Sequence, residues 1–353
     1  MRTHPTFRRD AIATACAAAL IATPMAPAMA APGSSASDFI DRFTGPIDNG
    51  EAPAGSVRAE YSTAGPHTVA ATQDPHSCES LFMRVYTGIA TKTQGLNKAP
   101  ECYGYAPEDA LSPAGIEYIY PSDLAPGEKA PLIVLSPGIG AEPGMLDEQA
   151  RLYASHGYIV AMGFTTLNWF GVQLNAAALG AVISAQEEGN PLYDHIDFTN
   201  TALVGHSAGG GSALTVAGAM EKSMQPLVEG FSINAIVGQN PGPSEFGIAT
   251  VPTDAKTLVI VADKETVAPA EFSRMRYDQI TNAPAWWVGT RNTTHASAID
   301  YVDNSPVAGL TLSFLQYAIR GDANAKALYT GAFTLQHDPE LFATERNAQA
   351  QAL

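Results

Sequence analysis

A serine between two glycines is the residue whose type and surroundings best suit covalent chemistry in this chain. Residues 205–209 have the sequence Gly-His-Ser-Ala-Gly, a G-x-S-x-G pattern, and they follow an apolar segment and precede one of helical composition. Such a strand-to-helix turn lifts the serine hydroxyl clear of the sheet, and its glycines permit a strained backbone. The sequence therefore predicts that Ser207 is a nucleophile and that the adjacent His206 has a packing or hydrogen-bonding role.

His295 is the expected general base. A serine hydroxyl is a weak nucleophile until a base accepts its proton, and imidazole suits that task. His295 follows the apolar segment 285–289 through a short loop, which is where the chain order serine, acid, histidine predicts the base. The other late histidine, His337, comes after the last predicted helix of the core.

Two carboxylates compete for the role of the acid that orients His295 and stabilises its cation. Asp263 and Glu265 both follow the apolar segment 257–261. A side chain at the end of a strand points into the sheet edge, whereas one two residues later lies in a loop that bends toward the histidine. This favours Glu265, with Asp263 as the alternative.

The tetrahedral intermediate of acyl transfer also needs backbone N–H donors at its oxyanion. We expect one from Ala208, directly after the nucleophile, and one from Ile139, in the turn after the apolar segment 131–135. We expect no metal ion and no cofactor.

Segments of strand and helix alternate from residue 115 onward, and they must position these groups. Apolar runs and helical spacing predict strands at 115–120, 131–135, 158–162, 201–204, 232–237, 257–261 and 285–289, and helices at 145–155, 172–186, 210–220, 269–280 and 307–319. Such alternation is typical of βαβ units. It predicts an α/β fold with a mainly parallel central sheet and helices on both faces.

The first thirty residues have the layout of a secretory signal peptide. Three arginines precede an alanine-rich apolar stretch, and a small-residue site ends at Ala30. We therefore expect cleavage near Ala30 and a secreted chain, extracellular or periplasmic. Residues 1–30 hold three arginines and one aspartate, so their removal changes the net charge from −16 to −18. That charge disfavours nucleic acid as a partner, and no later apolar run is long enough for an integral membrane segment.

Two cysteines, Cys78 and Cys102, remain after removal of the leader, which contains Cys16. In an oxidising compartment we expect a disulfide between them, worth roughly 3 kcal/mol in the chain-entropy model. Two free thiols are the alternative.

Several segments resemble the bacterial cutinase and polyester (PET) hydrolase family, over residues 115–319. The similar segments are the turn 136–138, residues 154–160, 165–167 and 173–177, the elbow 205–211, the acid loop 262–269 and the histidine loop 292–295. The resemblance implies the α/β-hydrolase fold and a secreted serine hydrolase of carboxylic esters. Glu265 falls where the family has its catalytic aspartate, which further favours it as the acid.

The chain also departs from that family around the expected substrate pocket. Ile139 stands where the family usually has an aromatic residue, and the loop 239–243 lacks the family's tryptophan. Trp169 and Phe170 are candidate pocket residues instead, with core or rim packing as the alternative. The segment from Cys78 to Cys102 has no counterpart in the resemblance and is either a lid or a stapled excursion.

These expectations divide the chain into a signal peptide (1–30), an N-terminal extension with outer strands and the disulfide (31–114), a catalytic core (115–330) and a C-terminal tail (331–353). The expected substrate is a small-molecule, lipid or polyester ester. A secreted acyltransferase on the same fold is the alternative function, because the sequence does not show whether water or another hydroxyl accepts the acyl group. An intact set of catalytic groups argues against a third class, a catalytically silent binding protein.

Overall fold

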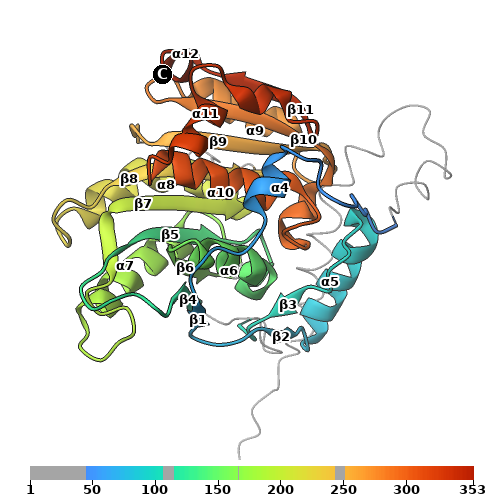
Figure 1. Cartoon of the computed structure of the whole chain (residues 1–353). Coiled ribbons are helices and arrows are strands. Elements are labelled where there is room, and N and C mark those ends of the chain that lie inside the picture. The colour runs from blue at the N-terminus through green and yellow to red at the C-terminus, as the bar shows by residue number, and fades with distance from the viewer. Residues whose placement is uncertain (1–44, 106–114, 166, 243–250) are drawn as a thin grey trace, which may run out of the picture.

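One sheet of nine strands organises the protein (Figure 1). The computed structural model describes residues 45–105, 115–165, 167–242 and 251–353, so the predicted signal peptide lies outside the described residues. In spatial order the strands are β1 (Val69–Ala71), β4 (Gly115–Pro121), β6 (Ile159–Phe164), β5 (Ala130–Ser136), β7 (Ile196–His206), β8 (Ile233–Gln239), β9 (Lys256–Lys264), β10 (Ala285–Thr294) and β11 (Leu341–Arg346).

The six neighbouring strands β6, β5, β7, β8, β9 and β10 run parallel to one another. Strands β1, β4 and β11 add antiparallel pairs at the two edges. The central strands β5 and β6 are almost entirely buried, as their continuous apolar runs predict. The predicted α/β-hydrolase fold is confirmed. Strand register aligns Ser136 with Gly205 and His206 with Gln239, so the carboxyl ends of β5, β7 and β8 lie side by side.

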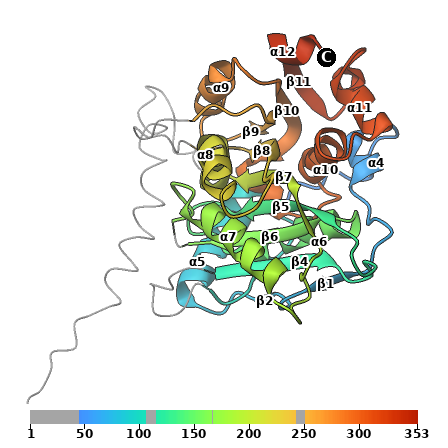
Figure 2. The same cartoon turned by 90° about the vertical axis from the view of Figure 1, so that its left-hand side faces the viewer.

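Helices cover both faces of the sheet (Figure 2). One face packs against α6 (Asp147–Ser155) and α10 (Pro306–Ala318), and the other against α7 (Val172–Gln186), α8 (Ala208–Met224) and α9 (Ala270–Gln279). The remaining helices are α4 (Val57–Tyr61), α5 (Leu81–Gln94), α11 (Ala323–Tyr329) and α12 (Ala348–Gln351), with 3₁₀ turns η1 (Pro143–Leu146), η2 (His295–Ile299) and η3 (Thr334–His337). Among the described residues, no helix is both long and apolar enough to span a membrane.

Several strands extend beyond their predicted ends, among them β9 and β10. The apolar run of β9 ends at residue 261, but the strand continues to Lys264, and β10 continues past 289 to Thr294. The ladder between these strands shifts register between Thr290 and Thr294, and exposed residues lie within the shift. Hydrophobic patterning misses these extensions because their residues are mostly polar, even where they are buried, as Thr290, Thr293 and Thr294 are. As a result β10 ends directly before His295.

Residues 331–353, expected to form a tail, contain a strand of the sheet. Within that region β11 pairs antiparallel with β10, and α12 follows it. The ring of Phe342 fills the space beside Gly289, where an added Cβ would lie 2.4 Å from the ring. Nothing in the sequence indicated β11, because only the first residue of this short edge strand is buried and its hydrophobic pattern is therefore weak.

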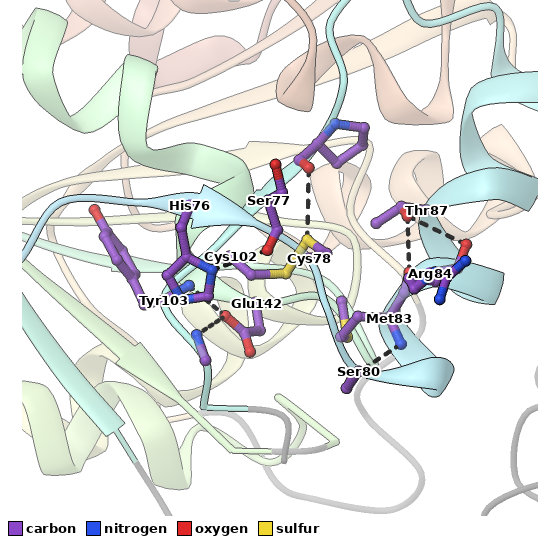
Figure 3. Close-up of a disulfide and its surroundings, with 12 residues drawn as sticks. His76, Ser77, Cys78, Ser80, Met83, Arg84, Thr87, Cys102, Tyr103 and Glu142 are labelled. Atoms are coloured by element: carbon purple, nitrogen blue, oxygen red, sulfur yellow. Dashed lines mark hydrogen bonds between the residues drawn. A yellow bond between two sulfur atoms is a disulfide. The ribbon is translucent and has the colours of Figure 1, made fainter. Parts of the chain in front are cut away.

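The predicted disulfide between Cys78 and Cys102 is confirmed (Figure 3). It closes an excursion that contains α5 and is framed by the two-stranded pair β2 (His76–Ser77) and β3 (Glu101–Cys102). The buried carboxylate of Glu142 accepts hydrogen bonds from the Tyr103 and Gly104 N–H groups at 2.6 and 3.0 Å. Figure 1 shows α5 apart from the central sheet, on the side to which the parallel strands point.

Loss of the disulfide should destabilise the protein. The bond joins residues 24 positions apart. Its loss lets that loop of the denatured chain move freely, which lowers the free energy of unfolding by about 3 kcal/mol. Urea denaturation of the oxidised protein and of the Cys78→Ser/Cys102→Ser variant measures this difference. The variant also serves as the control, because reductant should not change its stability. Equal midpoints and slopes for the two proteins would contradict the prediction.

Candidate active site

Ser207 occupies a strained turn between β7 and α8. Its φ is +54° and its ψ is −121°, a conformation that costs a non-glycine residue of order 1–3 kcal/mol. Backbone hydrogen bonds hold the turn: the Ser207 N–H donates to the Gln239 carbonyl at 2.9 Å, and the Ser207 carbonyl accepts from Gly211 and Gly242, also at 2.9 Å. The strain is therefore imposed by the neighbouring strand and the following helix.

Two glycines of the elbow are needed for close approach of backbones. A Cβ on Gly205 would lie 2.3 Å from the backbone of Gly209. A Cβ on Gly209 would lie 2.4 Å from the carbonyl oxygens of Ser136 and Pro137 at the end of β5. Glycine at these positions lets the elbow sit against the turn that follows β5.

His295 meets Ser207 from the end of β10. Its Nε2 lies 2.8 Å from Ser207 Oγ, within hydrogen-bond distance. The carbonyl of His295 accepts hydrogen bonds from His206 Nε2 at 2.8 Å and from Asn240 Nδ2 at 3.1 Å. His206, inside the elbow, therefore ties the elbow to the histidine loop, which is the hydrogen-bonding role that the sequence predicts for it.

Glu265 contacts the other nitrogen of the imidazole. Its Oε2 lies 2.8 Å from His295 Nδ1, and the two side chains are only 5% and 8% exposed. Its Oε1 accepts from the Val267 and Ala268 N–H groups at 2.7 and 2.9 Å. Burial opposes ionisation, yet the charge and hydrogen bond of His295 together with these N–H groups hold the pKa of Glu265 below its ordinary value. The carboxylate is thus fully hydrogen-bonded beside the histidine.

Asp263 faces a different set of donors. Because β9 extends to Lys264, Asp263 lies within the strand, on its exposed part. Its carboxylate accepts from the N–H groups of Asn292 and Thr293 at 2.7 and 3.0 Å. Asp263 therefore shapes the loop before His295, and the structure brings Glu265, not Asp263, to the imidazole.

The two segments that carry the expected oxyanion donors lie beside the serine. A Cβ on Gly138 would lie 2.9 Å from Ser207 Cβ and 3.4 Å from Ser207 Oγ, so the turn that carries Ile139 abuts the nucleophile. Ala208 begins α8 directly after the serine. Within the described part of the chain, no group accepts a hydrogen bond from the N–H of Ile139 or of Ala208.

Trp169 and Phe170 lie in the loop before α7. Their rings stack with centroids 5.9 Å apart; Trp169 is partly buried, whereas Phe170 is 48% exposed. Two apolar neighbours are also exposed, Leu167 on the same loop and Val172 at the start of α7. This loop presents apolar side chains to solvent close to the turn at Gly138, to which Asn168 donates a hydrogen bond at 2.7 Å.

Sequence reasoning missed several residues that hold the site together. Gln239, at the end of β8, donates through Nε2 to Gln149 and Thr311 at 2.9 Å each, and Gln149 in turn donates to the carbonyl of Ala298 in η2. Asn240 follows, and its Oδ1 accepts from the Ala262 N–H at 2.8 Å. The sequence could have indicated Gln239 and Asn240 because they follow the apolar segment 232–237, at the carboxyl edge of the sheet where functional side chains gather.

The stapled helix α5 bridges the two catalytic loops. Tyr86 Oη donates to the Ile139 carbonyl at 3.1 Å, and Thr294 Oγ1, beside His295, donates to the Gln94 carbonyl at 2.8 Å. The disulfide-closed excursion therefore supports both the turn at Ile139 and the loop at His295. No sequence pattern links Tyr86 to Ile139, because the contact depends on how the excursion folds back.

Among the described residues, no three or more His, Cys, Asp or Glu side chains are arranged so that they could hold a metal ion. Comparison with known proteins gives one positive result. A family model described as PET hydrolase-like matches residues 110–335, nearly two thirds of the chain. A search of curated proteins found no significant match.

His206 should make the protein acid-sensitive. Burial, and next the charge of His295, lower the pKa of His206 to about 3, whereas an unfolded histidine titrates near 6.5. Between these values the unfolded chain binds a proton that the folded chain does not, so the free energy of unfolding falls as pH decreases. One such proton gives a slope of at most ~1.4 kcal/mol per pH unit.

The His206→Gln variant isolates this effect, because glutamine keeps a donor for the His295 carbonyl but does not titrate. Urea denaturation between pH 6.5 and pH 4 should show a shallower loss of stability in the variant than in the original protein. Parallel stability curves for the two proteins would contradict the assignment of a neutral, buried His206.

Proposed function

The chain belongs to the PET hydrolase-like family, and we propose that it is a serine hydrolase of carboxylic esters with Ser207, His295 and Glu265 as its catalytic groups. One observation carries the proposal: the unbroken chain of contacts from Ser207 Oγ to His295 Nε2 and from His295 Nδ1 to Glu265, each 2.8 Å long. Nucleophile, base and acid in mutual hydrogen-bond reach are the geometric signature of such a triad.

Acylation follows from these contacts. His295 Nε2 accepts the proton of Ser207 as Oγ attacks the ester carbonyl, and Glu265 stabilises the imidazolium that forms. The developing oxyanion accepts hydrogen bonds from the N–H groups of Ala208 and Ile139. Collapse of the intermediate breaks the ester C–O bond, and His295 gives its proton to the departing alkoxide. Water, activated by the same imidazole, then attacks the acyl-enzyme, releases the acid and regenerates Ser207.

The apolar part of the ester is proposed to contact the loop that carries Trp169 and Phe170. The exposed side chains of Leu167, Phe170 and Val172 offer an apolar surface next to the elbow, and the stacked indole gives Phe170 a rigid support. Such a surface suits lipid, short-chain or polyester esters. The leader-like residues 1–30 and the Cys78–Cys102 disulfide support secretion as the setting, with cleavage near Ala30.

Hydrolysis of a panel of p-nitrophenyl esters, tributyrin and a polyester film tests the function. The protein should release acid from at least the activated esters, with a rapid burst of p-nitrophenol that matches the enzyme concentration, because the acyl group is held on Ser207. Ser207→Ala should abolish both the burst and turnover while leaving the fold intact. Turnover that survives in Ser207→Ala would refute the assignment.

The acid is tested by a matched pair of substitutions. Glu265→Gln should lower kcat by up to ~10⁴-fold, because the imidazolium loses its anionic partner. Asp263→Asn should cost far less, since that carboxylate only accepts hydrogen bonds from the loop before His295. Steady-state kinetics on one p-nitrophenyl ester decides the matter, and a crippled Asp263→Asn with an active Glu265→Gln would reverse the two roles.

A further inference from the structure

Asn168 is fully buried in the loop before α7, with a left-handed φ of +47°. Its side chain contacts the turn that carries Ile139: Nδ2 donates to the Gly138 carbonyl at 2.7 Å and to the Ala141 carbonyl at 3.0 Å. Its Oδ1 accepts from the Thr165 N–H at 2.8 Å. Every hydrogen-bonding group of this amide is therefore directed at a backbone group.

Residues 138–141 form a β-turn. The Ala141 N–H donates to the Gly138 carbonyl at 3.1 Å, and Gly140 has a φ of +69°, which suits glycine at the third position of such a turn. Besides Asn168, the described contacts to its carbonyl oxygens include Tyr86 Oη at the Ile139 carbonyl.

Peptide geometry links Asn168 to the expected oxyanion donor. The Gly138 carbonyl and the Ile139 N–H belong to one planar trans peptide, in which the two groups point in opposite directions. A hydrogen bond that fixes the carbonyl therefore fixes the direction of the N–H. Since Gly138 abuts Ser207 and no described group accepts from the Ile139 N–H, that direction determines whether the donor meets an oxyanion.

We infer that Asn168 is a positioning residue that orients the Gly138–Ile139 peptide, so that its N–H donates to the oxyanion formed at Ser207. The inference rests on the proposed function. Donation to the carbonyl also polarises the peptide, which strengthens its N–H as a donor in a water-poor site. The amide of asparagine suits this position because it both donates to two carbonyls and tolerates a left-handed backbone.

The substitution Asn168→Asp tests the role, since aspartate has nearly the same shape and keeps the acceptor for Thr165. An ionised carboxylate has no proton to donate to Gly138 and repels its carbonyl, whereas a protonated one restores a single donor. We expect kcat on a p-nitrophenyl ester to fall ~10–100-fold at alkaline pH with KM little changed, because removal of a whole oxyanion donor costs about 10²–10³-fold. The inhibition constant of a boronic acid, whose adduct with serine is tetrahedral, should rise by a similar factor.

Ser212→Ala is the matched control. Ser212 Oγ donates to the carbonyl of Asn168 at 3.4 Å, so its removal perturbs the same residue without touching the amide. The control should keep kcat and the boronate affinity of the original protein. If Asn168→Asp does not fold, Asn168→Ser, whose shorter side chain cannot span both carbonyls, is judged by the same criteria.

Three outcomes separate this inference from the proposed function. A fall in kcat and boronate affinity in the Asn168 variant alone supports the inference. A kcat within twofold of the original at every pH, or an equal loss in Ser212→Ala, overturns it while leaving the triad in place. Absence of ester hydrolysis by the unsubstituted protein would instead refute the proposed function, and with it the inference.

Discussion

The strained backbone of Ser207 is the constraint on which the site depends. A non-glycine residue at positive φ persists only where its surroundings impose it, and here β8, the first turn of α8 and Gly242 hold its two peptide groups. The residues around this turn must in addition let backbone segments approach one another closely. Gly205 and Gly209 have no room for a side chain, so the elbow lies directly against the end of β5. The turn that carries Ile139 also lies close to the serine, because Gly138 has no side chain to separate them.

The parallel strands bring the other groups of the site to Ser207. The carboxyl ends of β5, β7, β8, β9 and β10 meet at one edge, and each delivers a different group to it. His206 and Asn240 both donate to the His295 carbonyl, so the elbow and β8 fix the backbone of the base. In this buried setting the Glu265 carboxylate keeps its charge because His295 and two backbone N–H groups replace the lost water.

Local pattern was enough to predict the catalytic core of the fold. The G-x-S-x-G elbow, the order of elements and the bounds of α7 follow from residue type and hydrophobic period alone. The polar ends of β9 and β10 do not, because each is paired with a neighbouring strand, and even its buried residues, such as Thr290 and Thr293, are polar. Residues such as Tyr86, Asn168 and Gln149 were beyond sequence reasoning for the same reason: each acts through a partner distant in the chain. The place of the excursion around α5 is fixed by its disulfide and by Glu142, which joins segments distant in the chain.

A crystal structure of the protein after reaction with a p-nitrophenyl alkylphosphonate would show whether Ser207 is the nucleophile and which N–H groups meet the oxyanion, because the adduct is a stable copy of the tetrahedral intermediate. We expect a covalent bond from phosphorus to Ser207 Oγ and an adduct oxygen within about 3 Å of both the Ala208 and the Ile139 nitrogens. His295 should still lie between Ser207 and Glu265. An adduct on another residue would refute Ser207 as the nucleophile, and an adduct oxygen that points away from both N–H groups would refute the proposed oxyanion donors.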